Sequence, residues 1–288
     1  MIVVTGATGK LGHCVVGALL EKVPTAELAV AVRNPAKAAT LAARGVQVRR
    51  ADYDQPETLS AAFAAGDNVL LISANEIGKR ATQHLRVVDA ARAAGVGLLA
   101  YTSLLRADTS RLALAEEHRI TEQAIRASGL PYVLLRNGWY LENHTDQIAG
   151  ILQRGTTVGA AAGGRFASAA RKDYADAAAE VLTSSGHENR IYELAGNAFT
   201  LSEFAAEVGR QTGKRIVYTN LTPEAYKDVL VGAGLPGPYA DVLVDADVGA
   251  SQGELDSQSV DLPRLIGRPA TSLRDAIAAA LKSPALAQ

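Results

Sequence analysis

The 288-residue chain is poor in the residues from which disulfide frameworks and metal sites are built. It has a single cysteine, Cys14, which excludes an internal disulfide and a metal site with several cysteine ligands. Cys14 falls inside a helical pattern, and we interpret it as core filler. The five histidines are scattered along the chain without the spacing of metal ligands. We therefore expect no metal site.

The chain also lacks an excess of charge and long apolar runs. A formal net charge of −1 gives no electrostatic basis for binding nucleic acid or an anionic membrane surface. No apolar run approaches the ~20 residues of a membrane-spanning helix. A strand pattern starts almost at the first residue and leaves no room for a signal peptide, so we expect a cytoplasmic protein. The hydrophobic content of 48% is ordinary for a globular protein with a substantial core.

What the chain does contain is an alternation of strand and helix patterns. Six strands separated by helices predict a doubly wound Rossmann-type parallel sheet of the α/β class, with ligands at the carboxyl ends of the strands. The expected strands after the first cover residues 28–32, 46–50, 69–72, 98–101 and 132–135. The expected helices between them cover residues 35–43, 56–65, 80–94 and 112–128.

The regular alternation of strand and helix patterns ends after residue 143. Residues 150–164 hold five glycines and read as a loop-rich passage, followed by a helix over 173–185. A strand over 190–194 is expected to return to the sheet. We predict a nucleotide-binding domain over residues 1–198 and a smaller, mainly helical lobe over 199–288, with the substrate cleft between them.

A glycine-rich turn follows the first strand directly and leads into an amphipathic helix. Gly6 permits a tight turn, Gly9 lets the backbone approach a pyrophosphate, and Gly12 allows helix and strand to pack closely. A helix N-terminus favours negative charge, so the phosphates of a dinucleotide would bind there. The spacing is GxxGxxG, and the alternative is a turn that only packs the helix on the strand. The residues expected to bind cofactor are Gly6, Ala7, Thr8, Gly9, Lys10, Leu11 and Gly12.

Arg33 follows the second strand pattern, where many NAD enzymes place an acidic residue for the ribose 2′-hydroxyl. An arginine at this position suits the 2′-phosphate of NADP. Lys37, one helical turn later, could add a second positive charge. The alternative for Arg33 is a solvated charge at the start of a helix. We favour NADPH as the cofactor.

The catalytic pair of the short-chain dehydrogenases is absent. These enzymes protonate an alkoxide with a Tyr-x-x-x-Lys pair on a helix, and none of the nine tyrosines has a lysine four residues later. Tyr132 has Arg136 at that spacing, but it lies in a strand pattern and arginine does not deprotonate. Such a chain either only senses nucleotide or passes hydride to an acceptor that needs little acid catalysis. A quinone fits, and so does a cationic conjugated dye.

Four segments together resemble the NmrA-like branch of the atypical short-chain dehydrogenases, in particular its bacterial quinone reductases and triphenylmethane reductases. The glycine turn alone is common to many families, whereas the last segment combined with Arg33 is far more specific. The resemblance extends to residues 245–250 near the end of the chain. The four segments are Thr5–Gly12, Ala31–Lys37, Tyr101–Leu105 and Leu135–Asn143.

The resemblance implies an NADPH-dependent reductase without flavin or metal, and it implies further site residues. Ser73 and Asn75 would flank the cofactor after the fourth strand, with Thr102 and Ser103 at the same edge. Asn137 would lie beside the nicotinamide after the sixth strand. Asn143 and Tyr140 would position the acceptor, because a polar side chain beside a flat ring can orient its carbonyl.

Several neighbouring residues have two interpretations. Trp139 and Tyr140 either line the cleft or plug the space under the second lobe. His144 either supplies a proton or is a surface histidine at a helix start, the commoner case. Residues 116–119, Glu-Glu-His-Arg, read as a solvated helix face.

The leading hypothesis is thus a reductase that passes hydride from NADPH to a small quinone-like acceptor. The alternatives are a redox-sensing regulator that binds NADP(H) without turnover and acts through a protein partner, and a reductase of triphenylmethane-like dyes. The sequence predicts no nucleic-acid partner and leaves the oligomeric state open.

Overall fold

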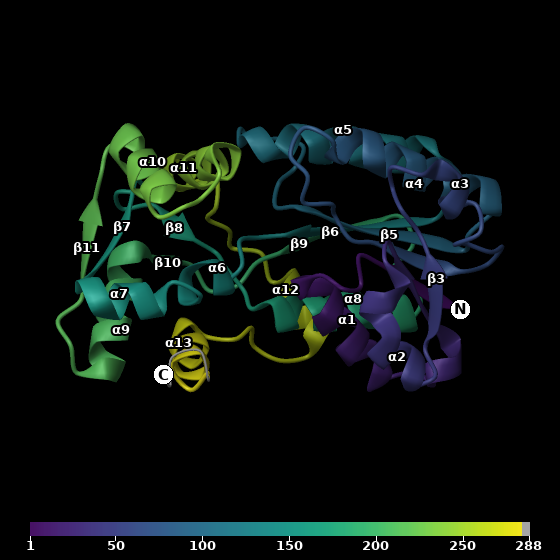
Figure 1. Cartoon of the computed structure of the whole chain (residues 1–288), viewed down its shortest axis with the longest axis horizontal. Helices are drawn as coiled ribbons and strands as arrows, with labels where there is room; N and C mark the ends of the chain where they lie inside the picture. Colours follow the sequence, from purple (N-terminus) through teal and green to yellow (C-terminus); the bar gives the residue numbers. More distant parts are fainter. Residues whose placement is uncertain (284–288) are drawn as a thin grey trace.

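The computed structural model describes residues 1–283, and its larger lobe is built on one parallel sheet (Figure 1). The seven strands lie in the order β3-β2-β1-β4-β5-β6-β9, and every neighbouring pair is parallel. The strand order reverses between β1 and β4, which opens a crevice at their carboxyl ends. This confirms the predicted α/β fold and the return of the last strand to the sheet. The strands are β1 Ile2–Thr5, β2 Leu28–Val32, β3 Gln47–Arg50, β4 Asn68–Leu71, β5 Leu98–Leu104, β6 Tyr132–Asn137 and β9 Arg190–Leu194.

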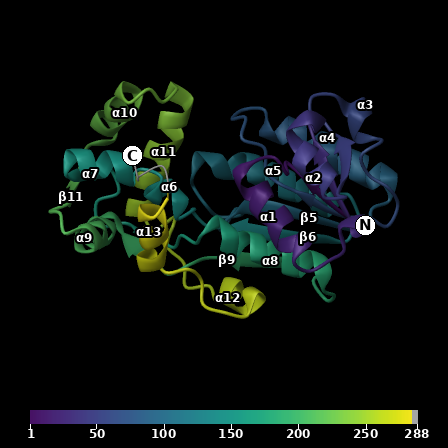
Figure 2. The ribbon, with the colours of Figure 1, turned by 60° about the horizontal axis from the view of Figure 1, so that its bottom comes forward.

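Helices cover both faces of the sheet (Figures 1 and 2). Alternate strand residues point to opposite faces, so Val4 joins the hydrophobic cluster under α1 and α8, whereas Val3 joins the cluster under α3, α4 and α5. The first face carries α1 Lys10–Leu20, α2 Ala39–Ala43, α8 Arg171–Thr183 and α12 Asp261–Ile266. The second carries α3 Pro56–Leu59, α4 Arg80–Ala94 and α5 Ala113–Ala127. The connections include 3₁₀ helices at Thr25–Glu27 and Pro35–Ala38.

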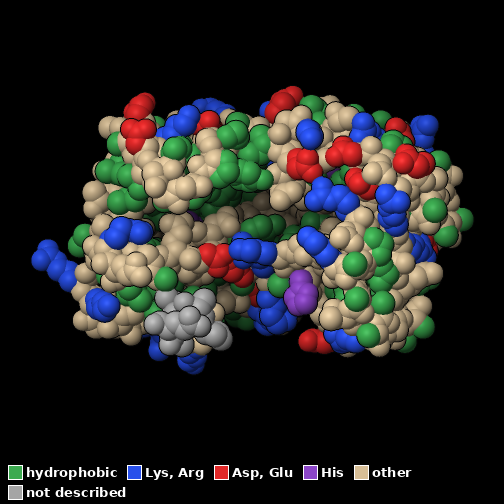
Figure 3. Space-filling model, in the orientation of Figure 1, with side chains coloured by type: hydrophobic (Ala, Val, Ile, Leu, Met, Phe, Trp, Pro, Cys, Tyr) green, Lys and Arg blue, Asp and Glu red, His purple; other side chains and the backbone are tan. Residues whose placement is uncertain are grey.

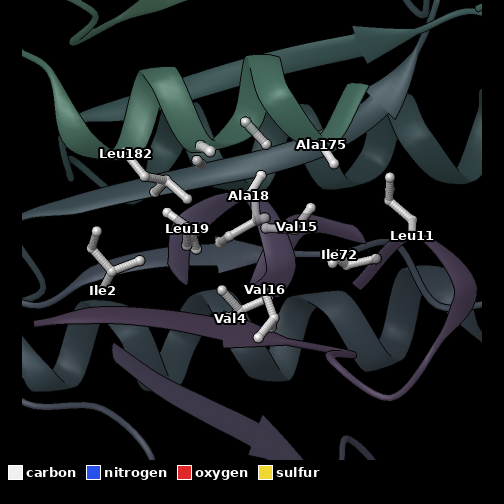
Figure 4. Close-up of a cluster of buried hydrophobic side chains, with 14 of the residues drawn as sticks. Ile2, Val4, Leu11, Val15, Val16, Ala18, Leu19, Ile72, Ala175 and Leu182 are labelled. Carbon is white, nitrogen blue, oxygen red and sulfur yellow. The ribbon is translucent and has the colours of Figure 1, made fainter. Parts of the chain in front are cut away.

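Helix α1 is packed between the sheet and α8 (Figure 4). Val15 and Leu19 on α1 are completely buried, and the small side chain of Ala175 on α8 lets the two helices approach closely. Burying one such valine or leucine contributes about 1.5–3 kcal/mol. The position of α1, and with it the position of the glycine turn, is therefore fixed by the core.

The smaller lobe lies to one side of the sheet, at the left of Figure 1. It contains two small sheets, in which β7 pairs with β11 in parallel and β8 pairs with β10 in antiparallel orientation. Its strands are β7 Thr156–Gly159, β8 Arg165–Phe166, β10 Phe199–Thr200 and β11 Val217–Asn220. Its helices are α6 Glu142–Thr145, α7 Ile148–Arg154, α9 Leu201–Thr212, α10 Pro223–Gly232, α11 Gly237–Ser251 and α13 Leu273–Leu281.

The predicted loop over residues 150–164 is wrong, because this stretch contains most of α7 and all of β7. Gly155 adopts φ +71° and ends α7, so this glycine marks a helix end and not a long loop. Strand β7 forms its ladder with β11, whose residues lie far later in the chain, and no local pattern announces that pairing.

Two of the expected helices differ from the prediction: one is shorter, and the other begins as a 3₁₀ turn. The helix predicted over 56–65 ends at Leu59. The stretch over 35–43 begins as a 3₁₀ turn in which the Asn34 side chain accepts a hydrogen bond from the backbone of Ala36, and only then becomes α2.

The division into residues 1–198 and 199–288 stays a prediction. Strand pairing adds that residues 142–166 contribute to the smaller lobe, while α12 near the other end of the chain packs against α8 and β9 of the larger one. Within residues 1–283, no helix is both long and apolar enough to cross a bilayer.

Asp247 on α11 is a buried acid in the smaller lobe, with a side chain that accepts a hydrogen bond from the backbone N–H of Ala160 at 2.7 Å. Burial raises its pKa to about 6. A carboxyl whose pKa is raised on folding favours the folded state at low pH, and this contribution is lost as the pH rises through the folded pKa. From this group alone, we expect the free energy of unfolding to fall by roughly 2–3 kcal/mol between about pH 4 and pH 7.

Chemical denaturation of the wild type and Asp247→Asn across this range measures the effect. The variant keeps an acceptor for Ala160 and has no carboxyl to ionise, so it should gain stability relative to the wild type as the pH rises. Asp228→Asn, on the exposed surface of α10, is the matched control. An equal pH dependence in wild type and Asp247→Asn would contradict the prediction.

Candidate active site

A cavity of about 750 Å³ lies at the carboxyl edge of the sheet, in the hollow between the two lobes (Figure 3). Its volume is in the usual range for small-molecule and cofactor sites. Ala7 is buried in the core beneath α1 and does not line the cavity. All the other predicted site residues line it: Gly6, Thr8, Gly9, Lys10, Leu11, Gly12, Arg33, Ser73, Asn75, Asn137, Tyr140 and Asn143.

The glycine turn has the geometry of a phosphate cradle. Gly6 adopts φ +60°, and the N–H of Gly9 donates to its carbonyl oxygen at 3.0 Å. A Cβ at Gly12 would lie 2.3 Å from that oxygen, whereas a Cβ at Gly9 would lie 3.3 Å from it. No side chain caps the start of α1, so its first backbone N–H groups are left for a ligand. Gly12 therefore serves close packing, and Gly9 leaves the approach to the turn open.

Arg33 lies directly after β2 at the opposite end of the cavity from β6, and its side chain is 71% exposed. It forms an ion pair with Glu76 at 3.3 Å, and Lys79 pairs with the other oxygen of the same carboxylate at 3.4 Å. Lys37 is exposed on the 3₁₀ turn and is not among the cavity residues. At this end of the cavity, the positive charge of Arg33 is therefore partly neutralised by Glu76, a residue that the sequence motifs did not identify.

The segment after β4 is held from beneath by buried polar groups. Ser73 donates its backbone N–H to Thr102 Oγ1 at 2.9 Å, and Ala74 donates its N–H to Nε2 of His84 at 2.9 Å. The Arg80 guanidinium donates to the Ala74 carbonyl at 2.7 Å. This network fixes the floor of the cavity.

Asn75 connects the two lobes across the cavity. The hydroxyl of Tyr239, at the start of α11, donates to its carbonyl oxygen at 3.2 Å. Tyr239 lies far from the glycine turn in sequence, and no local motif could have identified it.

The segment that follows β6 supplies the other end of the cavity. Asn137 ends the strand, and its Oδ1 is buried without a hydrogen-bond partner among the described residues. Tyr140 packs edge-on against Tyr174 with ring centroids 5.4 Å apart. Arg171, the first residue of α8, lies over the Tyr140 ring at 5.2 Å and donates to Oδ1 of Asn143 at 3.3 Å. Arg171 also lines the cavity, and the sequence reading missed it.

The interpretation of His144 as a surface histidine at a helix start is wrong. Its ring is buried among Phe166, Phe199 and Phe204, at centroid distances of 5.0, 5.2 and 5.9 Å. Burial lowers its pKa to about 4. His144 lines a second cavity of about 30 Å³ together with Asn143, next to the main one.

Residues 116–119 are not a solvated helix face either. His118 is buried and lines the main cavity, and Glu117 pairs with Arg80 at 3.1 Å. The spacing of Ala115, His118, Glu122 and Ile125, all on the buried face of α5, carries the signal that would have placed His118 inside.

Trp139 matches both of its interpretations, because it lines the cavity and packs against the hydrophobic cluster of the smaller lobe. Among residues 1–283, no group of three or more His, Cys, Asp and Glu side chains is arranged to hold a metal ion.

The residues present fit a dinucleotide with a phosphate on its ribose. The uncapped N-terminus of α1 and the bare Gly9 leave room for a pyrophosphate, and Arg33 offers a cation at the edge of β2. The unpartnered Oδ1 of Asn137 offers an acceptor for an amide N–H of a ligand at the far end.

Comparison with known proteins gives relatives over almost the whole chain. Quinone oxidoreductase 2 of Escherichia coli (strain K12) is 50% identical over 278 residues, which are 96% of this chain and 97% of that protein. The crystal structure of an NADPH-dependent quinone oxidoreductase from E. coli complexed with NADPH matches at TM-score 0.94 and 49% identity, covering 97% of this chain and 99% of that one. Citrobacter sp. triphenylmethane reductase complexed with NADP(H) matches at TM-score 0.94 and 40% identity, covering 98% and 100% of the two chains.

The family model that matches describes the NmrA-like family and covers residues 1–260. It therefore extends from β1 through the glycine turn to the residue just before α12. The resemblance that the sequence motifs indicated is confirmed, and the chain belongs to the NmrA-like family.

Proposed function

We propose that this protein is an NADPH-dependent reductase that transfers hydride directly to a quinone. The observation that carries the proposal is one continuous cavity that joins Arg33 and the glycine turn to the Asn137–Asn143 segment, in a chain without a Tyr-x-x-x-Lys pair. The quinone oxidoreductases at about half identity, of which one is complexed with NADPH, support both the cofactor and the acceptor class.

The chain's own residues divide the work of binding the cofactor. Arg33 would select the 2′-phosphate, the Gly6–Gly12 turn would hold the pyrophosphate, and Asn137 would face the nicotinamide end. Bound NADPH supplies the hydride. Ser73 and Asn75 flank the middle of the cavity, on a segment fixed by His84 and Arg80.

Asn143 and Tyr140 would position the acceptor. Arg171 holds both, through a hydrogen bond to one side chain and through the ring face of the other. With its oxygen engaged by Arg171, Asn143 keeps its amide N–H groups for an acceptor oxygen. Reduction of a quinone leaves an aromatic hydroquinone anion, which is far less basic than an alkoxide, so water can protonate it without an acid pair.

The acceptor is a small molecule, and the near-zero net charge supports our inference that nucleic acid is not a partner. We place the reaction in the cytoplasm. The experiment that tests the function follows NADPH oxidation by the purified protein with benzoquinone, with a triphenylmethane dye, and with neither. Quinone-dependent oxidation supports the proposal. Oxidation with the dye alone would favour a dye reductase, and tight NADPH binding without turnover would favour the redox-sensing regulator.

The second and third glycines of the turn, Gly9 and Gly12, provide a pair of substitutions with different expected effects. Gly9→Val should abolish NADPH binding and leave the melting temperature close to that of the wild type, because a Cβ there meets only the Gly6 oxygen at 3.3 Å. Gly12→Ala should lower the stability by about 1–3 kcal/mol, because its Cβ overlaps the Gly6 carbonyl. Nucleotide titration and thermal melting measure both. A large drop in melting temperature for Gly9→Val would assign it to packing.

The cation at the edge of β2 should set the preference for NADPH over NADH. Arg33→Ala should narrow that preference roughly tenfold or more, since a charge-assisted hydrogen bond contributes about 1.5–3 kcal/mol. Glu76→Gln should act in the opposite direction, because it removes the carboxylate that competes for Arg33. Dissociation constants for both nucleotides test this, with Lys37→Ala as the control outside the cavity. An unchanged preference in Arg33→Ala would remove Arg33 from the site.

Asn143 should matter for turnover more than for binding of NADPH. Its hydrogen bond to the acceptor oxygen strengthens as negative charge develops there, so Asn143→Ala should lower kcat for quinone roughly tenfold or more. The alternative role of capping a helix would cost about 1 kcal/mol of stability and no turnover; no side-chain cap is seen at the start of α6. Gln147→Ala, which removes a bond to the Asn143 carbonyl, is the matched control. Full turnover in Asn143→Ala would exclude a catalytic role.

A further inference from the structure

His118 lies at the acceptor end of the main cavity. It belongs to α5, which packs on β5 and β6, the strands whose ends carry Ser103 and Asn137. Arg33 follows β2, three strands away from β5, or about 14 Å across the sheet. The two ends of the cavity are therefore well separated, and α5 places His118 at the end formed by β5 and β6.

Helix α5 is fastened to the sheet one turn beyond His118. The Arg136 guanidinium on β6 pairs with the Glu122 carboxylate at 2.7 Å, and both side chains are almost fully buried. A second bond to the same carboxylate comes from the hydroxyl of Ser103 at 2.6 Å. The position of the imidazole relative to the strand ends is thus rigid.

The orientation of the imidazole is fixed by Tyr101. The phenol oxygen of Tyr101 lies 2.6 Å from Nδ1 of His118, and the tyrosine is completely buried. A phenol O–H is a stronger donor than the N–H of a neutral imidazole, so Tyr101 donates and Nδ1 accepts. The proton of the ring then resides on Nε2. Nε2 has no hydrogen-bond partner among the residues that the structure describes, and the residue lines the cavity.

Tyr101 also contacts a second imidazole. The ring of His84 lies edge-on to it, with the ring centroids 5.3 Å apart. Ala74 donates its N–H to Nε2 of His84, so Nδ1 of that ring carries the proton and donates to Thr121. Each of the three rings is therefore held by at least one hydrogen bond.

We propose that His118 donates a hydrogen bond from Nε2 to the carbonyl oxygen of the acceptor, and that Tyr101 is a positioning residue that holds His118 in the required tautomer. The proposal rests on the proposed function and adds to it the group that stabilises the developing negative charge. Hydride from the cofactor adds to the quinone, which gains two electrons and one hydrogen. A C–H bond forms at a ring carbon conjugated with the acceptor carbonyl, and the electron pair displaced from the conjugated double bonds settles on the carbonyl oxygen. That carbon then releases a proton to water, which makes the ring aromatic, and water protonates the two oxygens. The net change is one hydride and one proton per quinone, and the cofactor is left oxidised.

His118 keeps its proton throughout this step. Burial, with the charge of Arg80 and the neighbouring His84, lowers the pKa of His118 well below its usual value, so the ring is neutral at physiological pH. Burial also raises the pKa of Tyr101 well above its usual value, and the phenol does not become the proton source. A neutral, fixed N–H donor stabilises negative charge and does not have to regain a proton between turnovers.

The first test compares substitutions of His118 with a substitution of His187, which pairs with a tyrosine in the same way but lies outside the cavity. His118→Phe should lower kcat for benzoquinone roughly tenfold to a hundredfold, with the dissociation constant of NADPH unchanged, since one donor to a developing anion is lost. His118→Gln, which keeps an N–H donor, should recover part of the loss. His187 and Tyr192 form the same kind of pair at 2.7 Å, outside the cavity, and His187→Phe should keep full turnover. Full turnover in His118→Phe would overturn the proposal.

The second test reads the tautomer directly and does not depend on turnover. In the ¹⁵N spectrum of histidine-labelled protein, His118 should show a proton on Nε2, and hydroquinone added to the NADP⁺-saturated protein should shift that signal. Tyr101→Phe should give a mixture of tautomers and a kcat lowered by about threefold to tenfold. A proton on Nδ1 in the wild type, or no shift with hydroquinone, would overturn the proposal even if His118→Phe fails to fold. If the wild-type protein does not oxidise NADPH with any quinone, the proposed function is wrong. The tautomer of His118 can still be measured in that case, so the two failures are distinguishable.

Discussion

The close approach of α1 to the end of β1 determines where the rest of the site lies. Only a glycine at position 12 lets the helix begin against the Gly6 carbonyl, because a Cβ would come within 2.3 Å of that oxygen. Helix α8 packs along α1, and its first residue, Arg171, therefore reaches the same edge of the sheet. Arg171 in turn holds Asn143 and the face of Tyr140. A single backbone contact thus connects the phosphate cradle to the residues at the opposite end of the cavity.

The cavity needs both lobes, and the chain enters the second lobe three times. Residues after β6 leave the sheet to form α6, α7, β7 and β8, return through α8 and β9, and leave again for β10 and the elements up to α11 (Figure 1). Helix α12 then packs on the larger lobe before α13 joins the smaller one. Because β7 pairs with β11, the first two excursions form one folded unit. The hydrogen bond from Tyr239 to Asn75 then joins that unit to the segment after β4. The acceptor end is therefore shaped by segments that are distant in sequence, while the phosphate end is almost entirely local.

This difference explains what the sequence could and could not predict. The glycine turn, Arg33 and the alternation of strands with helices are local patterns, and the sheet and the cofactor end follow from them. The strand over 156–159 exists only through its partner 61 residues later, so the glycines in the sequence predict a loop there. The charged neighbours of His118, which are Glu116, Glu117 and Arg119, predict a surface position for it. The structure neutralises Glu117 with Arg80 from a different helix, a pairing that no spacing in the sequence reveals.

Buried imidazoles give the site its chemical character. His84 and His144 have pKa values lowered by burial to about 3 and about 4, and the pKa of His118 is lowered in the same way. None of the three is a cationic acid at neutral pH, and the pair that would protonate an alkoxide is absent. A ketone would be reduced poorly here, because its strongly basic product demands a full proton transfer. A quinone spreads the incoming charge over an aromatic ring and needs only a neutral N–H near its oxygen. The burial that removes acid catalysis from the cavity therefore also restricts the acceptors that it can reduce.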